Sequence, residues 1–187
     1  MLSSFERRMR GASGSLEAEM LELAHEVSCG AAVNPGIISE LARERIMLAA
    51  ASLRLADGVL AMITGLTSVG AQLAVCSDAG WEVAYVLESI PFGSMFRTVS
   101  ISCETGYLKS EPAGFDKVLS DLSAAPDQCM FVGDGGSNEL AVARGLGFRV
   151  VQISGRPGDL YDWSDRAHDH LSSLAELPRM FEAWRRN

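Results

Sequence analysis

The sequence predicts an α/β protein with a doubly wound parallel sheet, because short strand-like segments alternate with helical ones. Apolar runs at 73–77, 129–132 and 149–153 have the length and composition of buried strands. Segments with helical spacing of apolar residues lie between them, which favours parallel pairing through helical connections. An apolar share of 48% over 187 residues is enough for an ordinary globular core.

The first 56 residues predict a small helical cap-like region. Ser15 is a suitable N-cap residue for the first of two main helices. The apolar face of that helix consists of Leu16, Met20, Leu23, Ala24 and Val27. We expect this face to belong to the core rather than to a partner-binding surface. Asn34 followed by Pro35 predicts the start of the second helix, with Asn as the cap.

A core domain is predicted over residues 57–187, after a hinge at Ala56-Asp57-Gly58. Apolar spacing and flanking glycines predict the remaining elements of this domain. They are helices near 59–66, 113–122 and 139–146, a strand at 98–101 and a closing segment at 171–185. Gly147 is a suitable stop for the third of these helices. Leu174, Leu177 and Phe181 form a packing stripe in the closing segment.

A glycine-rich acidic turn, residues 133–139, follows the strand at 129–132. Asp134 and Glu139 are expected at the carboxyl end of the sheet, where ligands bind in folds of this class. Two carboxylates there can hold a hard divalent cation such as Mg²⁺, and Asn138 is close enough in sequence to orient it. The alternative is a solvated acidic turn that precedes a helix and binds no metal.

Two other segments precede this turn in the chain. The strand Leu73–Ser77 ends in a serine, and residues 106–112 contain Lys109 between a glycine and a proline. In their order and spacing, the three segments resemble three of the four signature motifs of the haloacid dehalogenase-like (HAD) hydrolase superfamily, which consists mostly of phosphatases. The resemblance covers about residues 56–177, and Ser110 replaces the proline that usually follows the lysine.

This resemblance implies a role for each motif. Ser77 would donate a hydrogen bond to a phosphoryl oxygen, and Lys109 would neutralise the charge of phosphate and nucleophile. The acidic turn would hold Mg²⁺, and the ligand would be a small molecule, phosphorylated in most of the family. The residues themselves leave two alternatives open. Ser77 or Asp78 could cap the helix that follows, and Lys109 could be an ordinary surface lysine.

The fourth signature motif, an Asp-x-Asp, is absent from the sequence. In the family its first Asp is the nucleophile, its second Asp is the general acid/base, and the strand it ends is central in the sheet. Residues 1–11 lack a strand pattern, so we expect the chain to begin after that strand. Two unpaired edges would result, and such edges favour pairing with another chain. Either the remaining strands close up directly, or a second copy or a partner fills the gap.

Three functional interpretations follow. The first is a HAD-type hydrolase whose nucleophile lies upstream of these residues. The second is a homologue without the nucleophile that works as a binding or scaffold protein. The third is a site recruited for non-hydrolytic chemistry on a small molecule. The cap-like region has no recognisable motif, and the substrate therefore stays open.

Composition narrows the choice of partners and compartment. A net charge of −8 disfavours nucleic acid and anionic membrane surfaces. Four widely spaced cysteines without a CxxC pair indicate reduced thiols in a cytoplasmic protein. No apolar run approaches the roughly 20 residues of a membrane span. The three histidines show no metal-binding spacing.

Overall fold

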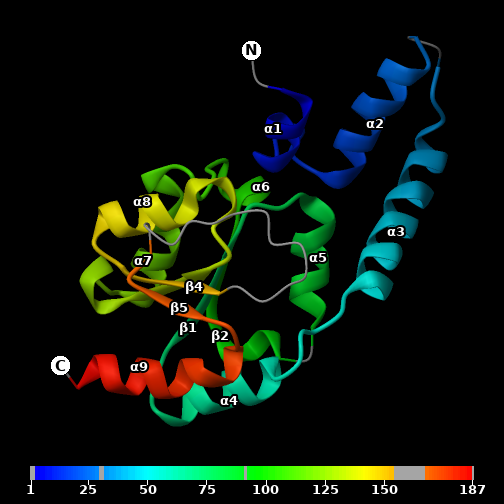
Figure 1. Ribbon diagram of the computed structural model, residues 1–187. Helices are drawn as coiled ribbons and strands as arrows, with labels where there is room; N and C mark the ends of the chain where they lie inside the picture. Colours follow the sequence, from blue (N-terminus) through cyan, green and yellow to red (C-terminus); the bar gives the residue numbers. More distant parts are fainter. Residues whose placement is uncertain (1–2, 30–31, 91, 154–166, 187) are drawn as a thin grey trace. The chain divides into compact units, whose positions relative to one another are not determined.

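The computed structural model describes residues 3–29, 32–90, 92–153 and 167–186 (Figure 1). The chain forms two compact units, each described by itself below. The first comprises Met1–Arg54, Ser77–Gly93 and Ser100–Leu108, and the second comprises Leu55–Cys76, Ser94–Val99 and Lys109–Asn187. The predicted boundary at residue 56 stays a prediction.

The first unit is helical. It contains α1 (Ser4–Met9), α2 (Leu16–Val27), α3 (Pro35–Ser52), α5 (Trp81–Ser89) and the short α6 (Ser102–Thr105). The two predicted helix starts are confirmed. The side chain of Ser15 accepts a hydrogen bond from the Ala18 N–H, and that of Asn34 accepts one from the Gly36 N–H. These bonds satisfy amides that have no partner inside the helix.

The apolar face of α2 is only partly buried. Leu16 is fully buried, but Leu23 is exposed and Val27 has 84% of its surface accessible. The prediction that this whole face belongs to the core is therefore wrong for its C-terminal half. Helices α2 and α3 lie against each other (Figure 1), and α3 buries only Ile38 and Ala42 completely.

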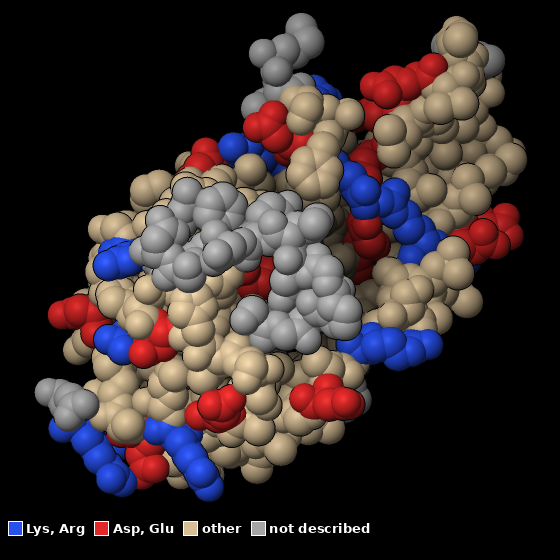
Figure 2. All heavy atoms as spheres, in the orientation of Figure 1, with Lys and Arg blue, Asp and Glu red and all other residues tan. Residues whose placement is uncertain are grey.

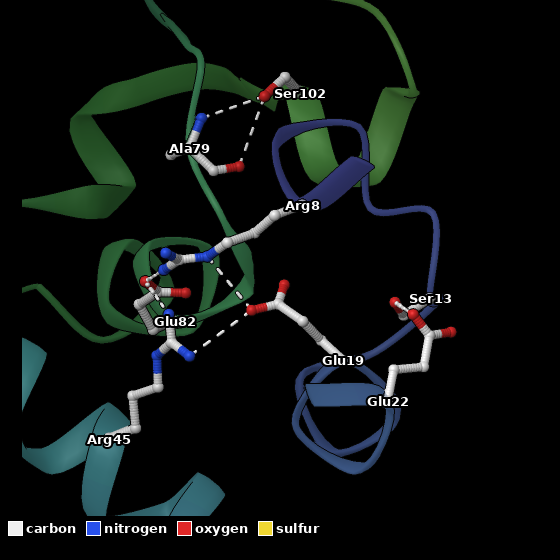
Figure 3. A network of polar contacts seen from close by, with 8 residues as sticks. All are labelled: Arg8, Ser13, Glu19, Glu22, Arg45, Ala79, Glu82 and Ser102. Carbon is white, nitrogen blue, oxygen red and sulfur yellow. Dashed lines mark hydrogen bonds and ion pairs between the residues drawn. The ribbon is translucent and has the colours of Figure 1, made fainter. Parts of the chain in front are cut away.

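A charged network joins four helices of the first unit (Figure 3). Arg8 of α1 and Arg45 of α3 both pair with Glu82 of α5, and Arg45 donates to Glu82 at 3.0 Å. The same two arginines lie 3.2 Å and 3.5 Å from Glu19 of α2. Glu19 is buried, so its charge depends on these arginines rather than on water.

The second unit contains most of the strands. Its elements are α4 (Val59–Ser68), β1 (Leu73–Ser77), β2 (Phe96–Ile101), α7 (Asp116–Leu122), β3 (Met130–Gly133), α8 (Glu139–Leu146), β4 (Arg149–Ile153), β5 (Asp169–Leu171) and α9 (Leu177–Arg185). Strands β1 and β2 each end in residues of the first unit. β3 pairs in parallel with β4, with Gly133 beside Gln152, and β4 pairs in parallel with β5.

Two adjacent valines of β4 show that helices cover both faces of this sheet. Val150 packs with Leu140 and Ala143 of α8, whereas Val151 packs with Leu66 of α4 and Leu177 of α9. Successive strand residues point to opposite faces, so these helices form separate layers (Figure 1). The predicted α/β class with a doubly wound sheet is confirmed.

Two details of the second unit also differ from the sequence-based predictions. The closing segment begins with strand β5, and its helix starts only at Leu177. In the described residues the strands form two sheets, β1–β2 and β3–β4–β5, and β1 does not pair with β3. The alternative in which the remaining strands close up directly is therefore not what the structure shows.

On the face visible in Figure 2, acidic and basic side chains are interspersed, and no extended basic area appears among the described residues. None of the described helices is both long and apolar enough to cross a membrane. All four cysteines are free thiols, as predicted.

Candidate active site

The acidic turn connects β3 to α8 through an unusual backbone. Gly135 has φ 99°, and the next two residues after Gly136, Ser137 and Asn138, have φ 54° and 63°. Consecutive non-glycine residues in the left-handed region each cost of order 1–3 kcal/mol and are concentrated at functional sites. The predicted start of the helix at Glu139 and its end at Gly147 are confirmed.

Lys109 and Glu139 form a buried ion pair. Lys109 Nζ donates to Glu139 Oε2, and the two side chains are 18% and 1% exposed. Lys109 lies in the turn that leads into the 3-10 helix Pro112–Phe115. Because the ammonium group neutralises a carboxylate that water does not reach, the description of Lys109 as an ordinary surface lysine is wrong.

The backbone of the turn holds the second oxygen of Glu139. The Gly135 N–H donates to Glu139 Oε1 at 3.3 Å. Gly133 leaves the space for this carboxylate, since a Cβ atom at that position would overlap Glu139 Oε1. Both carboxylate oxygens therefore have partners within the protein, one cationic and one a backbone amide.

Asp134 differs from Glu139 in its environment. It is exposed, and its Oδ1 accepts a hydrogen bond from the Gly136 N–H at 3.0 Å. Asn138 is also exposed on the same turn. No group of three or more His, Cys, Asp or Glu side chains suited to a metal occurs among the described residues. Mg²⁺ retains several waters and needs only one or two carboxylates, so the exposed carboxylate of Asp134 is compatible with this ion.

Ser77 is the last residue of β1 and belongs to the first unit. It does not cap the next helix, and neither does Asp78, because the N-cap residue of α5 is Gly80. The loop after Ser77 is held instead by Ser102. The Ser102 hydroxyl accepts from the Ala79 N–H at 3.0 Å and lies 3.4 Å from the Ala79 carbonyl oxygen (Figure 3). The predicted role of Ser77 in binding a phosphoryl oxygen stays a prediction.

The structure thus brings together Lys109, Glu139 and the backbone of the Asp134 turn. Sequence reasoning identified these residues but missed the ion pair, and it missed the functions of Gly133 and Ser102. A glycine six residues before a glutamate does not by itself indicate that a Cβ atom at the glycine would overlap the glutamate side chain. Nothing in the local pattern around Ser102 indicates that it anchors a loop more than 20 residues away in sequence.

Residues 5–147 match the family model described as a haloacid dehalogenase-like hydrolase, which covers most of the chain. The chain belongs to this family. The HAD assignment that the three motifs implied is therefore confirmed. The HAD chain has no match among curated proteins.

Solved HAD structures share the fold. A HAD phosphatase from Thermococcus onnurineus has TM-score 0.65 and 18% identity, and the match covers 94% of this chain and 87% of that one. L-2-haloacid dehalogenase from Xanthobacter autotrophicus has TM-score 0.63 and 15% identity, with 95% and 80% covered. A HAD family enzyme from Bacteroides thetaiotaomicron, in complex with magnesium and inorganic phosphate, has TM-score 0.58 and 20% identity, with 86% and 78% covered.

Proposed function

We propose that this HAD protein provides a Mg²⁺-dependent site of the phosphatase type for a phosphorylated small molecule. The observation that carries the proposal is the buried Lys109–Glu139 pair next to the exposed carboxylate of Asp134. A cation and a metal-binding carboxylate are the groups that phosphoryl transfer requires. The magnesium and phosphate in the Bacteroides enzyme support the same ligand class.

Each residue of the site has a proposed task. Asp134 holds Mg²⁺ with help from Asn138, and the ion supplies charge that stabilises the phosphoryl oxygens when bound. Glu139, which was predicted as one of the two carboxylate ligands, acts mainly by fixing Lys109, because both its oxygens already have protein partners. Lys109 neutralises phosphate charge, and Ser77 donates a hydrogen bond to a phosphoryl oxygen.

A second candidate is binding without turnover. It is favoured by the sequence itself, which contains no Asp-x-Asp and therefore does not supply the aspartyl nucleophile of the family. A third candidate is non-hydrolytic chemistry on a small molecule, which does not require Asp134. The fold alone does not choose, because the similar structures include both a phosphatase and a dehalogenase.

We also propose that another strand, from a second copy or a partner, completes the sheet. Strands β1 and β3 are apolar in sequence, yet all of their residues are only partly buried. Val150 and Val151 of β4 are fully buried by comparison. An apolar strand of a parallel sheet is normally covered on both faces and both edges. A cytoplasmic location, expected from the reduced thiols, remains part of the proposal.

The test is hydrolysis of 4-nitrophenyl phosphate by the purified chain with Mg²⁺ and after EDTA, with Asp134→Asn as the control. Loss of activity both in the variant and after EDTA supports the hydrolase. Folded protein that binds Mg²⁺ and phosphate by calorimetry but does not turn over supports the binding function. Turnover that persists in Asp134→Asn would point to the third candidate and contradict the proposed role of Asp134.

A further inference from the structure

Gln152 is a buried polar side chain that the proposed site has not used. It lies in β4 after the fully buried Val150 and Val151, and it is itself only 3% exposed. An amide buried in an apolar sheet is unfavourable unless it forms hydrogen bonds. Its presence in this strand therefore calls for a specific partner.

That partner is the backbone of the acidic turn. Gln152 Nε2 donates a hydrogen bond to the Asp134 carbonyl oxygen at 3.1 Å. The parallel register places Gln152 beside Gly133, the last residue of β3. The side chain therefore reaches one residue beyond the end of the neighbouring strand, to the first residue of the turn.

The same peptide group makes a second contact. The carbonyl of Asp134 and the N–H of Gly135 belong to one planar peptide unit. Its N–H donates to Glu139 Oε1, and Glu139 Oε2 accepts from Lys109. Fixing the direction of the carbonyl also fixes the direction of the N–H, because the unit rotates as a whole.

We infer that Gln152 is a positioning residue for the candidate active site. It holds the peptide between Asp134 and Gly135 and so sets the orientation of the Glu139 carboxylate and, through it, of Lys109. It also sets the direction in which the Asp134 side chain projects from the backbone. This last part rests on the proposed function, since it matters only if Asp134 binds Mg²⁺.

The experiment compares Gln152→Met, which keeps the length of the side chain but removes the donor, with Thr98→Val. Thr98 is a buried polar residue of another strand that donates to Asp121, so its replacement removes a hydrogen bond elsewhere in the same unit. Amide exchange and the amide chemical shift of Gly135 are measured by NMR on the metal-free protein. Mg²⁺ affinity is measured by titration calorimetry.

In Gln152→Met we expect the Gly135 amide to exchange at least about tenfold faster and to shift, and Mg²⁺ to bind about 10–100-fold more weakly. Thr98→Val should change neither quantity. An unchanged Gly135 amide in folded Gln152→Met would overturn the inference. If the wild type binds no Mg²⁺, the proposed function fails, and the Gly135 amide still decides the inference.

A second measurement covers the case in which Gln152→Met does not fold. The scalar coupling across the hydrogen bond, between the side-chain nitrogen of Gln152 and the carbonyl carbon of Asp134, is measured by NMR in the wild type. Its detection supports the inference. Its absence, under conditions where backbone couplings between β3 and β4 are visible, contradicts it.

Discussion

The two units of the molecule bury charge in different ways. In the first unit, Arg8 and Arg45 share Glu19 and Glu82, so each charge has two opposite partners (Figure 3). In the second unit, Glu139 depends on Lys109 as its one cationic partner among the described residues. A network tolerates loss of one member better than an isolated pair, because the remaining partner still neutralises the buried charge.

A second contrast is in the backbone. The network of the first unit joins side chains that project from regular helices. In the second unit, Glu139 of the pair directly follows two non-glycine residues of positive φ, Ser137 and Asn138. At the candidate active site, a strained backbone and a buried charge therefore coincide, which is the combination expected of a functional region rather than of a purely structural one.

The largest expected effect is that of Lys109→Met. It leaves the Glu139 carboxylate buried without a cation and should lower the free energy of unfolding by about 3–5 kcal/mol. Arg45→Met should cost less, about 1.5–3 kcal/mol, because Arg8 remains beside Glu82. Urea denaturation measures both, with Lys117→Met as the exposed-pair control at about 0.5 kcal/mol or less. Equal losses of unfolding free energy in Lys109→Met and Arg45→Met would contradict the claim that the isolated pair is more sensitive than the network to loss of one cation.

Gly133→Ala tests the space around Glu139. The added Cβ would overlap the Glu139 carboxylate, so we expect a loss of about 1–3 kcal/mol in the free energy of unfolding and a weaker Lys109–Glu139 pair. Gly145→Ala in α8 is the matched control. A Cβ there meets nothing, and removing a helical glycine should stabilise by about 0.5–1 kcal/mol. A neutral Gly133→Ala variant would show that Glu139 can move without cost.

The smallest expected effect is on the pH dependence of stability, and it distinguishes the two glutamates of the network, Glu19 and Glu82. Burial raises the pKa of Glu19, and Arg8 and Arg45 offset this only in part. Burial also acts to raise the pKa of Glu82, but its backbone hydrogen bond, Arg45 and Arg8 outweigh it, and the net pKa is lowered. The stability that Glu82 contributes is therefore present above its unfolded pKa and is lost as pH falls through its folded pKa. For Glu19 the contribution is present below its unfolded pKa and is lost as pH rises through its folded pKa.

The substitutions Glu82→Gln and Glu19→Gln should consequently change the loss of folding free energy at acid pH in opposite directions. In Glu82→Gln, the loss of stability between about pH 7 and pH 3 should become smaller than in the wild type. In Glu19→Gln it should become larger, because a group whose protonation favours the folded state has been removed. The measurement is the free energy of unfolding at a series of pH values. A change of the same sign in both variants would contradict the assignment.

Local patterns predicted the regular elements well where the signal is contained in a few residues. The strand at Leu73–Ser77, the helix at Glu139–Leu146 and the strand at Arg149–Ile153 have the predicted bounds. The short strand β5 was missed because Asp169-His170-Leu171 has little apolar character, and it forms by pairing with β4. Helix α1 was also missed, although Ser3 and Glu6 form a capping box.

The candidate site was predictable as a set of residues but not as a set of contacts. Order and spacing identified Lys109 and the turn around Asp134. The pairing of Lys109 with Glu139, 30 residues further on, depends on how the strands and helices pack, which local sequence does not encode. The same holds for Gln152, whose amide meets the turn only because β3 and β4 are adjacent and parallel.

The left-handed Ser137 and Asn138 also have a consequence for the thermodynamics of ligand binding. Residues with a Cβ have few alternative conformations there, whereas glycines would let the turn sample many. The amides of Gly135 and Gly136 are already held by carboxylates of the same turn. A ligand that binds at this turn therefore meets a backbone that is ordered in advance, and the entropy it must remove from the protein is correspondingly small.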